Sequence, residues 1–226
     1  MEQPAHGHDA VERFYSRWAG LYDLLASGAP GIARVRKRAV DALSLAPGET
    51  AVEMGAGTGA NLPHLRRAVG PGGRVVGIDL AAGVLARSRS RVGRAGWENV
   101  GLVRGNATRP PVRQANAVLA TFVVGMFDDP GGAVDHWCDL LAPGGRITLL
   151  HAGRSDHPLA APANLAFRGF VRLGAPGNRL STDSPALDLE RSVEAAAERL
   201  QARCVEFRRE SLAGGYLTLD SGRVPE

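Results

Sequence analysis

Short apolar runs alternate with amphipathic stretches along the middle of this chain. Apolar runs of strand length lie at residues 50–54, 74–79, 99–104, 115–122 and 146–151. Between them, apolar residues recur at helical spacing over residues 61–69, 82–95 and 131–141. Because strands that alternate with helices form βαβ units, we predict an α/β protein whose parallel sheet is covered by helices on both faces.

Further elements are predicted on both sides of this region. Residues 10–26 and 31–44 have helical spacing, which indicates a helical N-terminal extension. A helix at 187–201 is followed by strand patterns at 203–211 and 215–219, which predict an antiparallel hairpin that completes a seven-stranded sheet. We interpret residues 1–226 as a single domain, which consists of N-terminal helices (1–44), a core (45–150), an insertion (151–188) and a C-terminal helix with the hairpin (189–226).

Composition narrows the possible classes of protein. The chain has 226 residues, of which 44% are hydrophobic, enough for one sizeable core. No apolar run approaches the ~18 residues that span a bilayer, and the first residues lack the apolar segment of a secretory signal. The net charge is +4, but the arginines are scattered, which argues against nucleic-acid binding. Cys138 and Cys204 lack metal-ligand spacing, so we expect reduced thiols in a cytoplasmic protein without a metal site.

The segment VEMGAGTGANL, residues 52–62, joins a predicted buried strand to a predicted helix. Gly55, Gly57 and Gly59 would let a ligand approach the backbone closely, and the free N–H groups of the helix would favour an anionic group. The spacing fits the dinucleotide loop G-x-G-x-x-G/A, but it also fits E/D-x-G-x-G-x-G, the loop for S-adenosylmethionine. Glu53 and the third alternate glycine favour S-adenosylmethionine over a nicotinamide cofactor.

Asp79 ends the second predicted strand. A carboxylate at this place accepts hydrogen bonds from the two hydroxyls of a ribose, a role that fits both cofactor classes. The alternative is that Asp79 caps the helix that follows.

With these motifs in order, the chain resembles the class I S-adenosylmethionine-dependent methyltransferases. VEMGAGTG resembles the first motif of that family, VVGIDLAAGVL its second-strand motif, RGNA its G-D-A motif, and LLAPGGRITLL its turn into the fifth strand. The resemblance covers about residues 45–150 and implies a Rossmann-like, doubly wound sheet that binds S-adenosylmethionine and releases S-adenosylhomocysteine. It implies that the cofactor contacts are Glu53, Gly55, Ala56, Gly57, Gly59, Asp79, Leu80, Asn106, Ala107, Thr121 and Phe122.

One departure from the family pattern concerns the adenine. Asn106 stands where G-D-A has an acid that binds the adenine amino group. The side-chain carbonyl of asparagine can still accept that hydrogen bond, although more weakly by ~1 kcal/mol.

The N-terminal segment FYSRWAGLYDLL resembles a segment of the subgroup that contains quinone-ring C-methyltransferases and bacterial phospholipid N-methyltransferases. By this resemblance, Tyr15 and Tyr22 close over the methionine end of the cofactor. The alternative is that both tyrosines pack the helix on the domain.

A general base, if the acceptor requires one, would come from the end of the fifth strand. His151 is the first candidate, with Asp156 and His157 after it, while the alternative for His151 is a packing or capping histidine. The insertion after it would form an acceptor lid by family resemblance. Its mixture of apolar and arginine residues suggests an apolar small-molecule acceptor, and peripheral contact with a membrane surface stays open.

Three functions remain from the sequence. The first is a small-molecule methyltransferase; the second is a phospholipid or quinone methyltransferase at a membrane surface; the third is a protein that binds S-adenosylmethionine without catalysis. A nicotinamide-dependent oxidoreductase is disfavoured, because the chain lacks a Tyr-x-x-x-Lys pair and its only lysine is Lys37.

Overall fold

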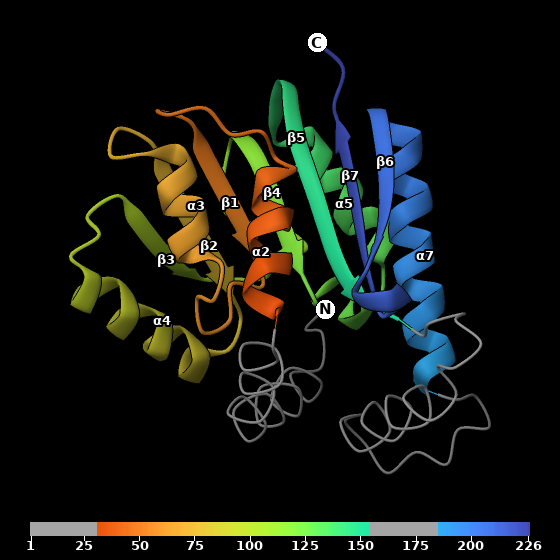
Figure 1. Cartoon of the computed structure of the whole chain (residues 1–226), viewed down its shortest axis with the longest axis horizontal. Coiled ribbons are helices and arrows are strands. Elements are labelled where there is room, and N and C mark those ends of the chain that lie inside the picture. The colour runs from red at the N-terminus through yellow and green to blue at the C-terminus, as the bar shows by residue number, and fades with distance from the viewer. Residues whose placement is uncertain (1–30, 154–184) are drawn as a thin grey trace, which may run out of the picture.

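A computed structural model of the chain describes residues 31–153 and 185–226, and its centre is one seven-stranded sheet (Figure 1). The strands are β1 (Thr50–Met54), β2 (Arg74–Asp79), β3 (Val100–Arg104), β4 (Ala115–Thr121), β5 (Leu141–Ala152), β6 (Val205–Leu212) and β7 (Leu217–Arg223), in the order β3-β2-β1-β4-β5-β7-β6. Strands β1 to β5 pair in parallel, and β7 runs antiparallel to both β5 and β6. The predicted Rossmann-like fold with an antiparallel C-terminal hairpin is therefore confirmed.

Helices cover both faces of the sheet (Figure 1). On one face, α2 (Ile32–Asp41), α3 (Leu62–Val69) and α4 (Ala82–Ala95) pack over a core of buried aliphatic side chains. On the other face, α5 (Pro130–Asp139) and α7 (Pro185–Arg203) pack over a second core, which surrounds the fully buried Trp137. Two single-turn helices, η1 (Val124–Met126) and η2 (Ala213–Gly215), complete the described elements. The predicted helix at 10–26 and the insertion at 154–184 lie outside the described residues.

The predicted turn at residues 142–145 lies inside β5 instead of before it. Ala115 pairs with Leu141, but Ala117 pairs with Arg146, so the turn is taken up as an irregularity in the register. Gly144, with φ of 72°, supplies the left-handed backbone conformation that this irregularity needs.

The crossover from β3 to β4 contains no helix, although it must pass the two strands that lie between them, β2 and β1. Its backbone is held from the side: the indole N–H of Trp137 on α5 donates a 2.7 Å hydrogen bond to the carbonyl of Ala107. Phe127 packs edge-on against the same indole, with ring centroids 5.9 Å apart. Helix α5 therefore positions this connection.

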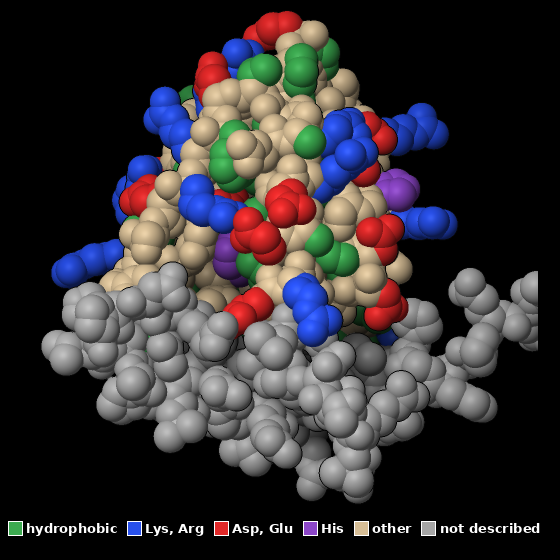
Figure 2. Space-filling view, turned by 90° about the vertical axis from the view of Figure 1, so that its right-hand side faces the viewer, with side chains coloured by type: hydrophobic (Ala, Val, Ile, Leu, Met, Phe, Trp, Pro, Cys, Tyr) green, Lys and Arg blue, Asp and Glu red, His purple; other side chains and the backbone are tan. Residues whose placement is uncertain are grey.

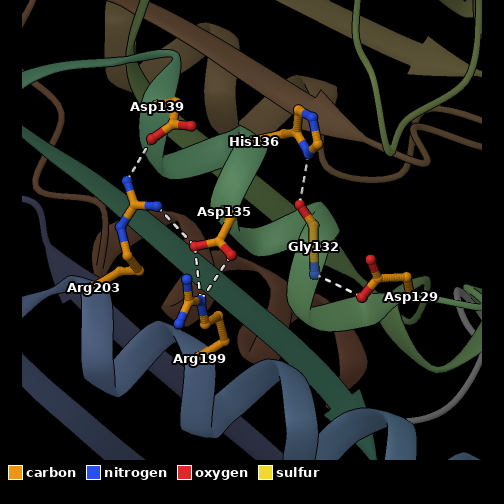
Figure 3. A network of polar contacts seen from close by, with 7 residues as sticks. All are labelled: Asp129, Gly132, Asp135, His136, Asp139, Arg199 and Arg203. Carbon is orange, nitrogen blue, oxygen red and sulfur yellow. Dashed lines mark hydrogen bonds and ion pairs between the residues drawn. The ribbon is translucent and has the colours of Figure 1, made fainter.

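Ion pairs between α5 and α7 fix α5 in turn (Figure 3). Asp135 accepts from Arg199 at 2.8 Å and from Arg203 at 2.7 Å, and Arg203 also reaches Asp139. At the start of α5, the carboxylate of Asp129 accepts from the backbone N–H of Gly132 at 2.8 Å and caps the helix.

The side of the molecule that carries α7 and β6 shows acidic and basic side chains interspersed (Figure 2). Several of them are paired, such as Arg209 with Glu194 and Arg223 with Glu206. No single-sign patch dominates this side among the residues that the structure describes.

Two further findings bear on the sequence predictions. No helix in the described part of the chain has the length and apolar character needed to cross a membrane. Cys138 and Cys204 are free, and they contact each other at the junction of α5 and β6. This contact, together with burial, raises the pKa of the Cys138 thiol.

Replacing Trp137 with Phe removes the N–H that the Ala107 carbonyl accepts and leaves a gap in the core. We expect the free energy of unfolding to fall by about 2 to 4 kcal/mol in chemical denaturation. Trp97→Phe is the matched control, because Trp97 is only partly buried; it should cost about 1 kcal/mol or less. Equal losses in both variants would contradict the anchoring role of Trp137.

Candidate functional site

A pocket of about 490 Å³ opens at the carboxyl ends of β1, β2 and β4. Strand β1 leads to β2 on one side, while β4 lies on its other side, so the pocket lies where the direction of strand order reverses. Of the residues predicted to bind a cofactor, ten line this pocket: Glu53, Gly55, Ala56, Gly57, Asp79, Leu80, Asn106, Ala107, Thr121 and Phe122. Tyr15 and Tyr22 lie outside the described residues.

Glycine is required at the three loop positions for different physical reasons. All three have positive φ, at 68° for Gly55, 55° for Gly57 and 78° for Gly59. A Cβ on Gly55 would lie 2.7 Å from Val123, and one on Gly59 would lie 2.6 Å from Leu62. Gly59 therefore serves close packing against its own helix and is not among the pocket-lining residues, whereas only the backbone conformation constrains Gly57.

Asp79 holds the backbone on both sides of the pocket. Its Oδ2 accepts from the N–H of Gly57 at 2.8 Å, and its Oδ1 accepts from the N–H of Ala81 at 2.9 Å. Burial raises the pKa of this carboxyl, and the hydrogen bonds from Ala81 and Gly57 oppose that shift. The alternative interpretation, Asp79 as the N-cap of the following helix, is wrong: the N-cap of α4 is Ala81, and no side chain makes a capping bond there. The ribose contact stays a prediction.

The side-chain carbonyl of Asn106 is already engaged. It accepts from the backbone N–H and from the hydroxyl of Thr108, both at 2.9 Å. A carbonyl oxygen has two lone pairs, so both are used while Thr108 bonds to it. The predicted adenine contact of the Asn106 carbonyl stays a prediction, and it requires the Thr108 hydroxyl to turn to another acceptor; the amide nitrogen is a second atom that a ligand could contact.

A buried polar network adjoins the pocket through Arg36, Glu53 and Thr121, and the sequence analysis missed two of its members, Arg36 and Asn61. Asn61 donates to Oε1 of Glu53 at 2.6 Å and to the hydroxyl of Thr121 at 2.9 Å, while its carbonyl accepts from Arg36 at 3.0 Å. Arg36 also donates to Thr121 at 3.3 Å. Four elements of the fold, namely α2, β1, the start of α3 and the end of β4, meet in this network.

Glu53 is the most unusual member of this network. It is 1% exposed, and its Oε2 has no hydrogen-bond partner among the described residues. Burial raises the pKa of Glu53 to about 7, against the hydrogen bond from Asn61 and the charges of Arg36 and Arg91. A buried carboxyl oxygen without a donor in a pocket indicates a ligand that brings one.

The buried position of Arg36 could have been recognised from the sequence. It occupies the same face of α2 as Ile32, Ala39 and Val40, all of which are buried. An arginine at an apolar position of an amphipathic helix indicates a buried partner for its charge. Asn61, in contrast, precedes a helix and has the sequence signature of an ordinary N-cap, yet its side chain makes no capping bond.

Phe122 has a strained backbone beside this network. Its φ is 58°, a left-handed conformation that is a genuine outlier for an aromatic residue. Its N–H donates to the carbonyl of Leu150 at 2.7 Å, and the guanidinium of Arg36 lies 5.3 Å from its ring centroid. Strain of this kind is retained where the surrounding structure needs the side chain in one place, and here that place is the pocket wall.

His151 is not brought to the pocket by the described residues. It lies two residues after Leu149 on β5, on the face that α5 and α7 cover, whereas Glu53 lies on the face of α2 and α3. Its Nε2 is 3.7 Å from Oδ2 of Asp220, a buried carboxylate that Arg209 binds through two nitrogens at 2.7 and 3.2 Å. Burial lowers the pKa of His151, although Asp220 opposes the shift. Its role as a base stays a prediction, and the other candidates, Asp156 and His157, lie outside the described residues.

Comparison with known proteins relates this chain to methyltransferases. A family model described as a methyltransferase domain matches residues 52–147. Phosphatidylethanolamine N-methyltransferase of Cereibacter sphaeroides is 32% identical over 68% of this chain and 73% of its own length. Nocamycin O-methyltransferase of Saccharothrix syringae is 32% identical over 60% of this chain, which spans about half of that protein (48%). A ubiquinone/menaquinone biosynthesis C-methyltransferase of Hahella chejuensis is 27% identical over 77% of this chain and 72% of its own length.

Solved structures show the same fold at low sequence identity. A phosphoethanolamine N-methyltransferase of Haemonchus contortus, solved with S-adenosylhomocysteine, superposes with a TM-score of 0.71 over 97% of this chain and 60% of its own, at 13% identity. A methyltransferase of Aquifex aeolicus gives a TM-score of 0.62 over 87% of this chain and 94% of its own, at 15% identity. This chain belongs to the class I S-adenosylmethionine-dependent methyltransferases.

The raised pKa of Glu53 makes the stability of the ligand-free protein depend on pH. The folded state holds the proton more tightly than an ordinary glutamate with a pKa of 4.5 does, so this contribution to stability is complete below pH 4.5 and is lost as the pH rises through 7. Glu53→Gln removes the titration. We expect the free energy of unfolding of the variant, measured by chemical denaturation and taken relative to that of wild type, to rise by roughly 2 to 3 kcal/mol as the pH increases from 5 to 8. Parallel pH profiles for the two proteins would contradict the assignment.

Asp79→Ala should weaken binding of S-adenosylhomocysteine by at least about tenfold in calorimetry, because ribose hydroxyls and the N–H of Gly57 both lose their acceptor. The fold should stay intact by circular dichroism. Asp139→Ala is the matched control, since it removes an exposed carboxylate of α5 that is not among the pocket-lining residues. Normal binding by Asp79→Ala would remove the ribose assignment.

Proposed function

We propose that this protein transfers the methyl group of S-adenosylmethionine to a small, apolar acceptor in the cytoplasm. The observation that carries the proposal is Glu53, whose buried Oε2 has no described partner in a pocket that Arg36 also lines. A buried acid and a buried guanidinium in one pocket match the ammonium and the carboxylate at the methionine end of the cofactor. Free thiols at Cys138 and Cys204 agree with a reducing compartment.

The remaining cofactor contacts follow the elements of the pocket. Asp79 would accept from the ribose, since each carboxylate oxygen keeps a second lone pair beside its bond to Gly57 or Ala81. Leu80 and Ala107 would enclose the adenine from β2 and from the crossover that Trp137 anchors. The amide of Asn106 would donate to a ring nitrogen of the adenine while Thr108 holds its carbonyl.

The chemistry asks little of the protein beyond binding and alignment. When bound, S-adenosylmethionine supplies a methyl group already activated by its sulfonium. The residues of this chain hold the donor and acceptor in line and exclude water, and such proximity can supply ~7–11 kcal/mol of the barrier. Phe122, Met126 and Phe127 give the described pocket an apolar wall that suits an apolar acceptor. His151 would serve only an acceptor that must lose a proton.

A second candidate function is methylation of a phospholipid or quinone at a membrane surface. Two relatives carry names for such acceptors, a phosphatidylethanolamine and a ubiquinone or menaquinone precursor. Helix α4 adds exposed arginines at 87, 89 and 94, which would suit anionic headgroups. A protein that binds the cofactor without catalysis is a third candidate, because His151, the candidate base, does not line the described pocket.

Calorimetry with S-adenosylmethionine, S-adenosylhomocysteine and NADH tests the cofactor first. We expect micromolar binding of the first two ligands and none of NADH. Transfer of a tritiated methyl group is then followed to soluble phenols and quinols, and to the same quinols and phosphatidylethanolamine in vesicles. Turnover in solution supports the first function, and turnover that needs vesicles supports the second. Tight binding without turnover on either panel supports the third, and binding of NADH alone would overturn the cofactor assignment.

A further inference from the structure

The orientation of Asn61 is fixed by the chemistry of its neighbours. Arg36 has only donors, so the carbonyl oxygen of Asn61 must face it, at 3.0 Å. The amide nitrogen then faces Glu53, and its two hydrogens go to Oε1 of Glu53 and to the hydroxyl of Thr121. Asn61 therefore holds one oxygen of Glu53 and leaves the other, Oε2, directed away from this bond.

Charged side chains on three described elements act on Glu53. Arg36 on α2 and Arg91 on α4 favour the ionised carboxylate, whereas Asp79 on β2 disfavours it. Asn61 favours the ionised form through its hydrogen bond, but burial is the largest influence and raises the pKa to about 7. The ligand-free carboxyl is thus balanced between its two protonation states near neutral pH.

We propose that binding of the ammonium group of the cofactor at Oε2 releases a proton from Glu53, and that Asn61 is the positioning residue that sets how much proton is released. The proposal rests on the proposed function, since the cation is the ammonium of the methionine end. The O–H bond of the carboxyl breaks, its proton passes to the buffer, and the ammonium keeps its three protons while it donates one hydrogen bond to the carboxylate. Cofactor affinity then increases with pH up to about 7 and stays level until the ammonium itself loses its proton at about pH 8.

Calorimetry in buffers of different ionisation enthalpy counts the protons. S-adenosylhomocysteine is titrated at pH 6.0, 6.5 and 7.0 in phosphate and in imidazole, a range in which an α-ammonium stays charged. We expect release of roughly half to one proton per molecule bound, highest at pH 6.0, and an affinity that rises several-fold from pH 6.0 to 7.0. 5′-Methylthioadenosine, which lacks the amino-acid end, should bind without proton release.

Variants separate positioning from simple structural support. Glu53→Gln should bind S-adenosylhomocysteine about tenfold more weakly at pH 7 and release no proton. Asn61→Ala should release more proton than wild type at pH 7.0 and shift the rise in affinity to higher pH, because the carboxylate loses its hydrogen bond. Asn116→Ala is the matched control: Asn116 accepts from Thr50 at the opposite end of β1, so the proton count should stay at the wild-type value.

The outcomes separate this proposal from the proposed function. Binding of S-adenosylhomocysteine with no proton release at any of the three pH values would overturn the proposal and leave the methyltransferase function standing. Failure of S-adenosylhomocysteine to bind at all would overturn both. An Asn61→Ala protein with a wild-type proton count and pH profile would overturn the positioning role of Asn61. If Asn61→Ala does not fold, Glu53→Gln and the comparison of S-adenosylhomocysteine with 5′-methylthioadenosine still decide whether Glu53 releases a proton on binding.

Discussion

A carboxyl group buried at the end of the central strand constrains the functional half of this molecule. Burying Glu53 without partners would cost several kcal/mol, so the fold must bring donors to it. Asn61 from the start of α3 reaches it directly, and Arg36 and Thr121 hold Asn61 in place. Helices α2 and α3 and strand β4 each supply one of these polar side chains around the end of β1. Within this network, Oε2 of Glu53 has no hydrogen-bond partner among residues 31–153 and 185–226.

Much of the fold was predictable because its local and global signals agree. Strands β1 and β2 and helix α4 begin and end at the predicted residues, since each apolar run is bounded by glycines, prolines or charges. The turn at 142–145 was misplaced relative to β5, because whether a Pro-Gly-Gly segment ends a strand or bulges within it depends on the neighbouring strand. Strand β7 runs to Arg223, beyond the predicted end, because its antiparallel pairing with β5 carries residues of low strand propensity.

The pocket was predictable to the extent that its residues follow strands in order. The glycine loop and Asp79 lie where the motif places them, but the reasons differ between residues. Gly59 is required by its close approach to Leu62, and the carbonyl of Asn106 accepts from the N–H of Thr108. Residue type and spacing do not specify either contact. His151 shows a second limit: both faces of β5 are buried, so its apolar pattern does not indicate on which face the imidazole lies.

The position of α2 has a consequence for how such a domain can be divided. The family model matches residues 52–147 and therefore contains β1 to β4, the glycine loop and Asp79, but not Arg36. A shortened chain that starts at the turn before β1 would keep every strand of the sheet and every family motif, and it would pass as a complete domain by sequence comparison. It would nevertheless lose Arg36, which donates to Thr121 and whose charge acts on Glu53, together with the buried side chains of Ala39, Val40 and Leu43. The segment that the family model matches and the unit that forms the complete pocket are thus different pieces of this polypeptide, because Arg36 lines the pocket from outside the matched segment.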